Sequence, residues 1–104
     1  MSKLQSQEAD HLFRAILSLE NVEECYHFFE DLCTINEFND MVQRFEAATL
    51  LYRGENYVSV SEKTGMSTAT ISRVRRCLHY GNNGYVTALE RLDGAEEKTE
   101  NNDG

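Results

Sequence analysis

Apolar side chains recur at three- and four-residue steps along most of the chain, the spacing that gives a helix one buried face. The helices predicted from this pattern cover residues 5–18, 22–33, 35–53 and 85–92, with two more between residues 57 and 80. No run reads as a strand longer than a few residues. We therefore expect an all-α fold of six helices joined by short connections.

Several of these helices carry their own start and stop signals. Asn21 stands where the second helix needs an N-terminal cap, and Thr34 with Glu37 three residues later forms a capping box for the long third helix. Gly54 follows that helix and suits a left-handed C-terminal position.

The stretch from Tyr57 to Tyr80 predicts a helix-turn-helix, with the motif itself at about 58–79. Ser59 and Glu62 read as a capping box for its first helix, Gly65 supplies the turn, and Ser67 is a good cap for its second helix. The apolar stripe of the second helix is Ile71, Val74 and Leu78. An ordinary helical hairpin on the protein surface is the alternative interpretation.

The outward positions of the second motif helix are small and hydroxylic at its start and basic further along. Small residues let a helix approach base edges, and arginine reaches phosphate oxygens or guanine. The residues that we expect to bind DNA are Lys63, Ser67, Thr68, Ala69, Thr70, Ser72, Arg73, Arg75 and Arg76.

The net charge of −8 looks unsuited to a DNA-binding protein, but the charge is unevenly distributed. Residues 1–62 hold 12 acidic and 4 basic side chains, residues 63–89 hold 4 basic and no acidic ones, and residues 90–104 hold 6 acidic and 2 basic ones. Only the motif is therefore positive, and the shape of the local field steers a polyanion more than the total charge does. We expect modest affinity unless two copies act together.

A chain of 104 residues is long enough for one domain, which we place at 1–92, followed by an acidic tail at 93–104 that we expect to be disordered. No apolar run is long enough to cross a membrane. The first residues lack a signal-peptide pattern, so a cytoplasmic location is expected.

Cys25, Cys33 and Cys77 form no CxxC pair, and the histidines are scattered. This argues against a disulfide framework or a metal site, and we expect three buried free thiols. No nucleophile with a base, paired carboxylates or phosphate-cradling glycine loop can be read, so the chain is not expected to be an enzyme.

The run from Thr34 to Arg73 resembles the core of the Trp repressor superfamily, in particular the Trp-repressor-related branch labelled YerC/YecD. The matching segments are Thr34, Leu50–Glu55 (LLYRGE), Gly65 and Ala69–Arg73 (ATISR). The resemblance implies an intertwined homodimer whose early helices interlock and whose two motifs emerge on one side. It also implies a repressor that binds double-stranded DNA at half-sites about 34–36 Å apart, the spacing known for helix-turn-helix dimers, the Trp repressor included.

The resemblance further places Arg44 and Arg73 where the family holds tryptophan, which makes them candidate effector-binding residues. The family has a glycine after the second arginine, whereas this chain has Val74, whose side chain takes space that the indole ring needs. We therefore expect DNA binding without L-tryptophan, or a response to another small effector. An ion pair with a nearby acid is the alternative role for Arg44, and a helical protein-interaction module without DNA or tryptophan binding is the alternative function.

Overall fold

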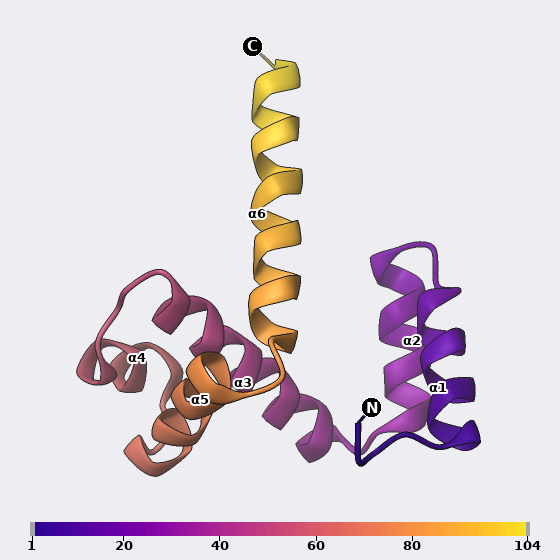
Figure 1. The fold of residues 1–104 in the computed structure, drawn as a ribbon, viewed down its shortest axis with the longest axis horizontal. Coiled ribbons are helices and arrows are strands. Elements are labelled where there is room, and N and C mark those ends of the chain that lie inside the picture. Colours follow the sequence, from indigo (N-terminus) through magenta and orange to yellow (C-terminus); the bar gives the residue numbers. More distant parts are fainter. Residues whose placement is uncertain (1, 104) are drawn as a thin grey trace. The chain divides into compact units, whose positions relative to one another are not determined.

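Six α-helices make up the chain in a computed structural model that describes the backbone of residues 2–103 and the side chains of residues 2–95 (Figure 1). They are α1 (Gln7–Leu17), α2 (Val22–Leu32), α3 (Ile35–Tyr52), α4 (Tyr57–Thr64), α5 (Thr68–Tyr80) and α6 (Gly84–Asp103). No strand occurs within residues 2–103. The predicted all-α fold of six helices is confirmed.

The predicted caps of α2 and α3 are present. Asn21 accepts a hydrogen bond from the Glu24 backbone N–H at 2.8 Å. The Thr34 hydroxyl accepts from the Glu37 N–H at 3.2 Å, and the Glu37 carboxylate accepts from the Thr34 N–H at 2.9 Å. Hydrogen bonds to the carboxylate, first from the Thr34 backbone N–H and then from the Thr34 side chain, hold the pKa of Glu37 below its ordinary value. Local side-chain chemistry therefore fixes where these helices begin.

The first motif helix begins earlier than the sequence predicts. The N-terminal cap of α4 is Asn56, whose side chain accepts from the Ser59 N–H at 2.9 Å. The Ser59 hydroxyl instead donates to the Glu55 carboxylate at 2.6 Å. The predicted capping box of Ser59 with Glu62 is therefore wrong. Asparagine is as good an N-terminal cap as serine, and Asn56 directly precedes the first residue of α4.

The last helix also differs from the expectation. The backbone of α6 is helical to Asp103, whereas the sequence predicts a helix ending at Leu92 and a disordered tail over 93–104. No proline interrupts this segment, and the alanine, glutamate and lysine residues after Gly94 favour a helix. The side chains of residues 96–104 lie outside the described part of the structure.

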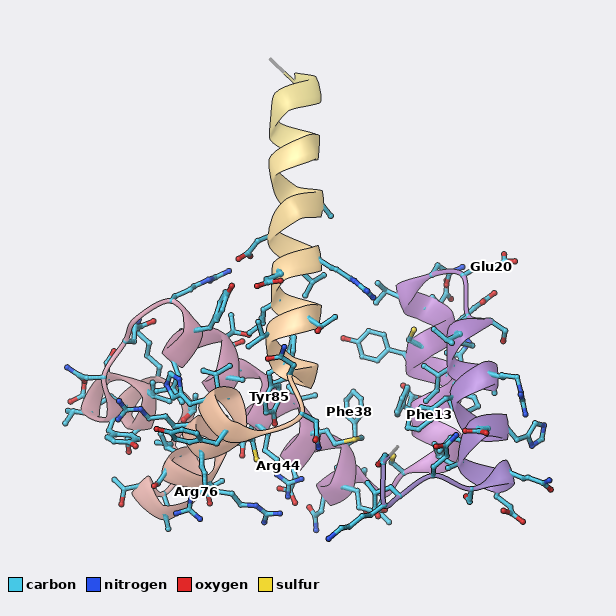
Figure 2. The ribbon with its side chains drawn as sticks, viewed as in Figure 1. Phe13, Glu20, Phe38, Arg44, Arg76 and Tyr85 are labelled. Carbon is cyan, nitrogen blue, oxygen red and sulfur yellow. The ribbon has the colours of Figure 1, made fainter. Side chains whose placement is uncertain are left out.

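Contacts within the chain define two compact units, residues 1–38 and 39–104, where the sequence predicts one domain over 1–92. In the first unit, α1 and α2 bury no residue, and the ring of Phe38 lies 6.3 Å from that of Tyr26. Figure 2 labels Phe13 and Phe38 in this unit. Several of its large apolar side chains, among them Leu17 and Ile35, are therefore exposed within one chain.

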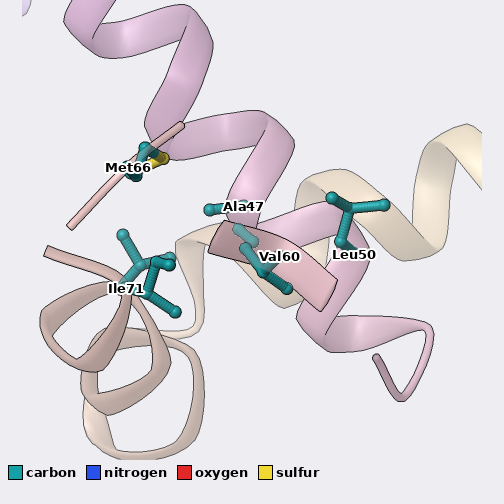
Figure 3. Close-up of a cluster of buried hydrophobic side chains, with 7 residues drawn as sticks. Ala47, Leu50, Val60, Met66 and Ile71 are labelled. Atoms are coloured by element: carbon teal, nitrogen blue, oxygen red, sulfur yellow. The ribbon is translucent and has the colours of Figure 1, made fainter. Parts of the chain in front are cut away.

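The buried core lies in the second unit (Figure 3). It is built by α3, α4, the turn and α5, and its members are Ala47, Ala48, Leu50, Val60, Met66, Ile71 and Val74. Tyr85 of α6 packs against this core, with its ring 6.3 Å from that of Phe45. The core thus holds α4 and α5 on the C-terminal half of α3.

The three cysteines are free thiols, but none of them is fully buried in the single chain, in contrast to the prediction. Cys25 and Cys33 are half-buried, and Cys77 is exposed. Cys77 precedes Leu78 on α5 and lies beside the buried stripe rather than on it. The prediction of a buried thiol at Cys77 is therefore wrong for the single chain.

Candidate nucleic-acid interface

The turn between α4 and α5 is built as the sequence predicts. Gly65 has a φ of 73°, and its N–H donates to the Ser61 carbonyl at 2.8 Å. The Ser61 hydroxyl donates to the Met66 carbonyl at 3.1 Å. Ser67 then caps α5 by accepting from the Thr70 N–H at 3.2 Å. These bonds fix the angle at which α5 leaves the turn.

The buried stripe of α5, which consists of Ile71, Val74 and Leu78, sets which side of the helix faces solvent. Ile71 is fully buried in the same cluster as Val60 of α4, which is also fully buried (Figure 3). Ala69, Arg73 and Arg76 recur at four- and three-residue steps on the opposite side of α5, and all three are exposed. This set is called the outward face of α5 below.

The predicted DNA-binding residues do not all have the same surroundings. Ser67, Thr68, Ala69, Arg73, Arg75 and Arg76 are exposed, as is Lys63, whereas Thr70 and Ser72 are half-buried. The structure thus leaves seven of the nine side chains exposed.

Lys63 is engaged in an ion pair that the sequence did not reveal. Its Nζ lies 2.6 Å from Glu55 Oε1, and Glu55 also accepts from the Ser59 hydroxyl. These hydrogen bonds, first that from Lys63, hold the pKa of Glu55 below its ordinary value. The positive charge of Lys63 is therefore partly balanced, unlike that of the arginines on α5.

Arg75 lies against an aromatic ring rather than pointing freely into solvent. Its guanidinium carbon is 5.3 Å from the centre of the Tyr57 ring. Sequence reasoning missed Tyr57, because no local spacing connects the first residue of α4 with a position on α5. Only the packing of the two helices brings these residues together.

The hollow that Arg44 lines does not include the other candidate effector residue. Arg44 lines a hollow of about 260 Å³ together with Asp40, Gln43, Met66, Ser67 and Thr70, and Arg73 is not among the lining residues. Val74 is 3% exposed and belongs to the core. Figure 2 shows Arg44 on α3 and Arg76 on α5.

The alternative role for Arg44, an ion pair with a nearby acid, is not seen. Among residues 2–95 the only ion pair joins Lys63 to Glu55. Within the same residues, no group of three or more histidine, cysteine, aspartate or glutamate side chains is arranged to hold a metal ion. None of the described helices is both long and apolar enough to cross a membrane.

Comparison with known proteins gives consistent matches over nearly the whole chain. The family model described as Trp repressor protein matches residues 7–93. The uncharacterized protein YerC of Bacillus subtilis (strain 168) is 52% identical over 99 residues, which cover 95% of each chain.

Two solved structures share the fold. A TrpR-like protein from Eubacterium eligens ATCC 27750 is 55% identical, with a TM-score of 0.84 over 88% of this chain and 94% of the other. A Staphylococcus aureus protein, whose assignment as a Trp repressor is provisional, is 48% identical, with a TM-score of 0.84 over 88% of this chain and 91% of the other.

Proposed function

The chain belongs to the Trp repressor family, and we propose that it is a sequence-specific regulator that represses transcription by occupying double-stranded DNA. The family consists of regulators rather than enzymes. In this proposal α5 is the recognition helix, with its N-terminal residues at the base edges and its arginines at phosphates or guanine.

The outward face of α5 is the observation that carries the proposal. Ala69 gives a small surface near the start of the helix, and Arg73 and Arg76 follow it on the same side, opposite the buried stripe. These arginines lie in residues 63–89, a stretch of 27 residues with four basic and no acidic side chains. A positively charged helix face with a small side chain near its N-terminus suits entry into the major groove.

We further propose that two copies form a homodimer through the first unit. Large apolar residues of this unit are exposed in the single chain, among them Phe13 at 58%, Leu17 at 83% and Ile35 at 80%. Large apolar side chains left exposed in one chain are a reason to expect a protein–protein contact. A two-fold dimer presents two copies of α5, which suits a palindromic operator with half-sites about one helical turn apart, roughly 34–36 Å.

Selection of bound oligonucleotides from a random duplex pool tests the DNA-binding proposal. The parent protein should enrich roughly palindromic sequences, and the double variant Arg73→Ala, Arg76→Ala should lose that enrichment. Arg91→Ala removes an exposed arginine of α6 outside the motif and is the matched control, which should select as the parent does. If the double variant enriches the same sequences as the parent, α5 is not the recognition helix. If the parent enriches nothing, the protein-interaction module becomes the better hypothesis.

Analytical ultracentrifugation tests the dimer. The parent should sediment at about twice the chain mass of 11.9 kDa. Leu17→Glu should weaken association because it places a charge in the proposed interface. Val58→Glu changes an exposed apolar residue of α4 and should leave the dimer intact. A parent that remains monomeric at micromolar concentration would refute the dimer.

A further inference from the structure

A hollow of about 440 Å³ lies along one flank of α5, next to its outward face. Its lining residues are Tyr57, Ser72, Arg75, Arg76, His79 and Tyr80. A second hollow of about 390 Å³ shares Tyr57, Arg75 and His79 with the first. The side chains that line both hollows therefore lie between the start of α4 and the C-terminal half of α5.

Tyr57 holds Arg75 in this hollow. The guanidinium carbon lies 5.3 Å from the ring centre, within the range of a cation–π contact. The pKa of the Tyr57 hydroxyl lies below its ordinary value. The main cause is a hydrogen bond from Arg75, and a hydrogen bond from Ser72 and the positive charges of Arg75 and Arg76 add to it. An arginine stacked on a ring keeps a planar, preorganised fork of N–H donors for an oxyanion.

The first hollow has the chemistry of an anion site. Two arginines, one histidine and three hydroxyl-bearing side chains line it, and no acidic residue does. Glu55 borders only the second hollow, where its carboxylate already accepts from Lys63 and Ser59. Several donors converging without a competing carboxylate favour a ligand with several acceptor oxygens, such as a phosphate.

The position of the hollow relates it to a bound duplex. A helix inserted in the major groove, which is about 12 Å wide, faces base edges in front and a sugar–phosphate backbone along each flank. Arg76 belongs both to the outward face of α5 and to the hollow, and Ser72, Arg75 and His79 lie on the flank of α5 beside it. The hollow therefore opens where one backbone of the duplex would run.

We propose that this hollow binds a phosphate of the DNA backbone through Arg75, Arg76, Ser72 and His79, and that Tyr57 is a positioning residue for Arg75. The inference rests on the proposed function, because it requires α5 to enter the groove. It assigns Arg75 to phosphate anchoring, whereas the sequence only groups Arg75 with the other outward arginines.

The salt dependence of binding to the selected duplex tests the site. Each neutralised phosphate contributes a slope of about 0.9 log unit in affinity per log unit of salt. Arg75→Ala should lower the slope by about that amount and leave the sequence preference unchanged. Tyr57→Leu should weaken binding in the same direction, and Tyr57→Phe, which keeps the ring under Arg75, should restore much of the affinity. Arg91→Ala should match the parent.

A second measurement separates failure of this inference from failure of the proposed function. Inorganic phosphate is titrated into the protein without DNA, at constant ionic strength, while NMR signals of Tyr57 and His79 are followed. Shifts that disappear in Arg75→Ala support an anion site in the hollow.

Each outcome then has one meaning. A parent that selects DNA but shows the same salt slope in Arg75→Ala overturns the phosphate site and leaves the proposed function standing. A parent that selects no DNA overturns both the proposed function and the backbone assignment. Phosphate shifts in that case would point to a small phosphorylated compound as the ligand.

Discussion

Replacing Gly65 with alanine should destabilise the protein even though the added methyl group has room. An ideal Cβ at this position meets no atom within 4 Å, so no steric collision is expected. The cost comes from the backbone, because the φ of 73° lies in the left-handed region that side chains with a Cβ disfavour. That strain is worth roughly 1–2 kcal/mol, which corresponds to a fall in Tm of about 4–8 °C per kcal/mol for a domain of this size.

Gly84→Ala is the matched control for this prediction. An ideal Cβ at Gly84 also meets nothing within 4 Å, but Gly84 does not have a positive φ. The same methyl group should there be neutral or stabilising by about 0.4–1 kcal/mol, because alanine lowers the entropy of the unfolded chain. Gly65→Asn should cost less than Gly65→Ala, since asparagine tolerates the left-handed conformation better.

The measurement is urea denaturation followed by the helical circular dichroism signal. All variants are compared at one protein concentration, because dimerisation would make the midpoint depend on concentration. If Gly65→Ala unfolds at the midpoint of the parent, the turn does not require the left-handed backbone described for it. If Gly84→Ala loses as much stability as Gly65→Ala, the sign of φ is not the cause.

Three further changes test other parts of the structure. Ile71→Ala removes a fully buried side chain and should lower the free energy of unfolding in urea by about 2–5 kcal/mol, against about 0.5–1.5 kcal/mol for Ile71→Val. Glu37→Gln should make the free energy of unfolding fall less as the pH is lowered into the acid range. Thr34 holds the pKa of Glu37 below 4.5, so this carboxylate stabilises the folded chain above that value and loses its effect as the pH falls through the folded pKa. Calorimetric titration with L-tryptophan should give no binding heat, because Val74 fills the position after Arg73 from within the core.

Each of these expectations has a contrary result. Unchanged stability of Ile71→Ala would mean that the core does not hold α5 in place. A pH curve of Glu37→Gln that parallels that of the parent would show that the capping carboxylate does not contribute to acid stability. Tryptophan binding at micromolar concentration would show that a ligand site survives beside Val74.

Features set by residues within one turn of each other could be predicted from the sequence. Ser67 caps α5 and Thr34 pairs with Glu37, and each of these contacts joins residues three apart. Gly65 takes the left-handed backbone conformation that glycine favours. The start of α4 could not be placed in this way because two caps compete. Asn56 takes the capping position, and the Ser59 hydroxyl bonds to the preceding Glu55 instead.

The less predictable parts of the candidate site depend on how α4 and α5 pack. The partner of Lys63 is eight residues away across α4, and Tyr57 meets Arg75 from a different helix. Periodicity shows which side of α5 is buried, but not which neighbouring helix lies against its flank. Sequence reasoning therefore identified the helix that faces solvent and missed the side chain that orients one of its arginines.

The lack of any buried residue in α1 and α2 has a consequence for dosage. If the proposed homodimer forms and most molecules are single chains, the number of dimers grows with the square of the amount of protein made, by mass action. Halving synthesis would then cut the regulator able to occupy an operator about fourfold. A regulator that binds DNA only as the proposed dimer would thus respond to its own expression level more steeply than a monomer does.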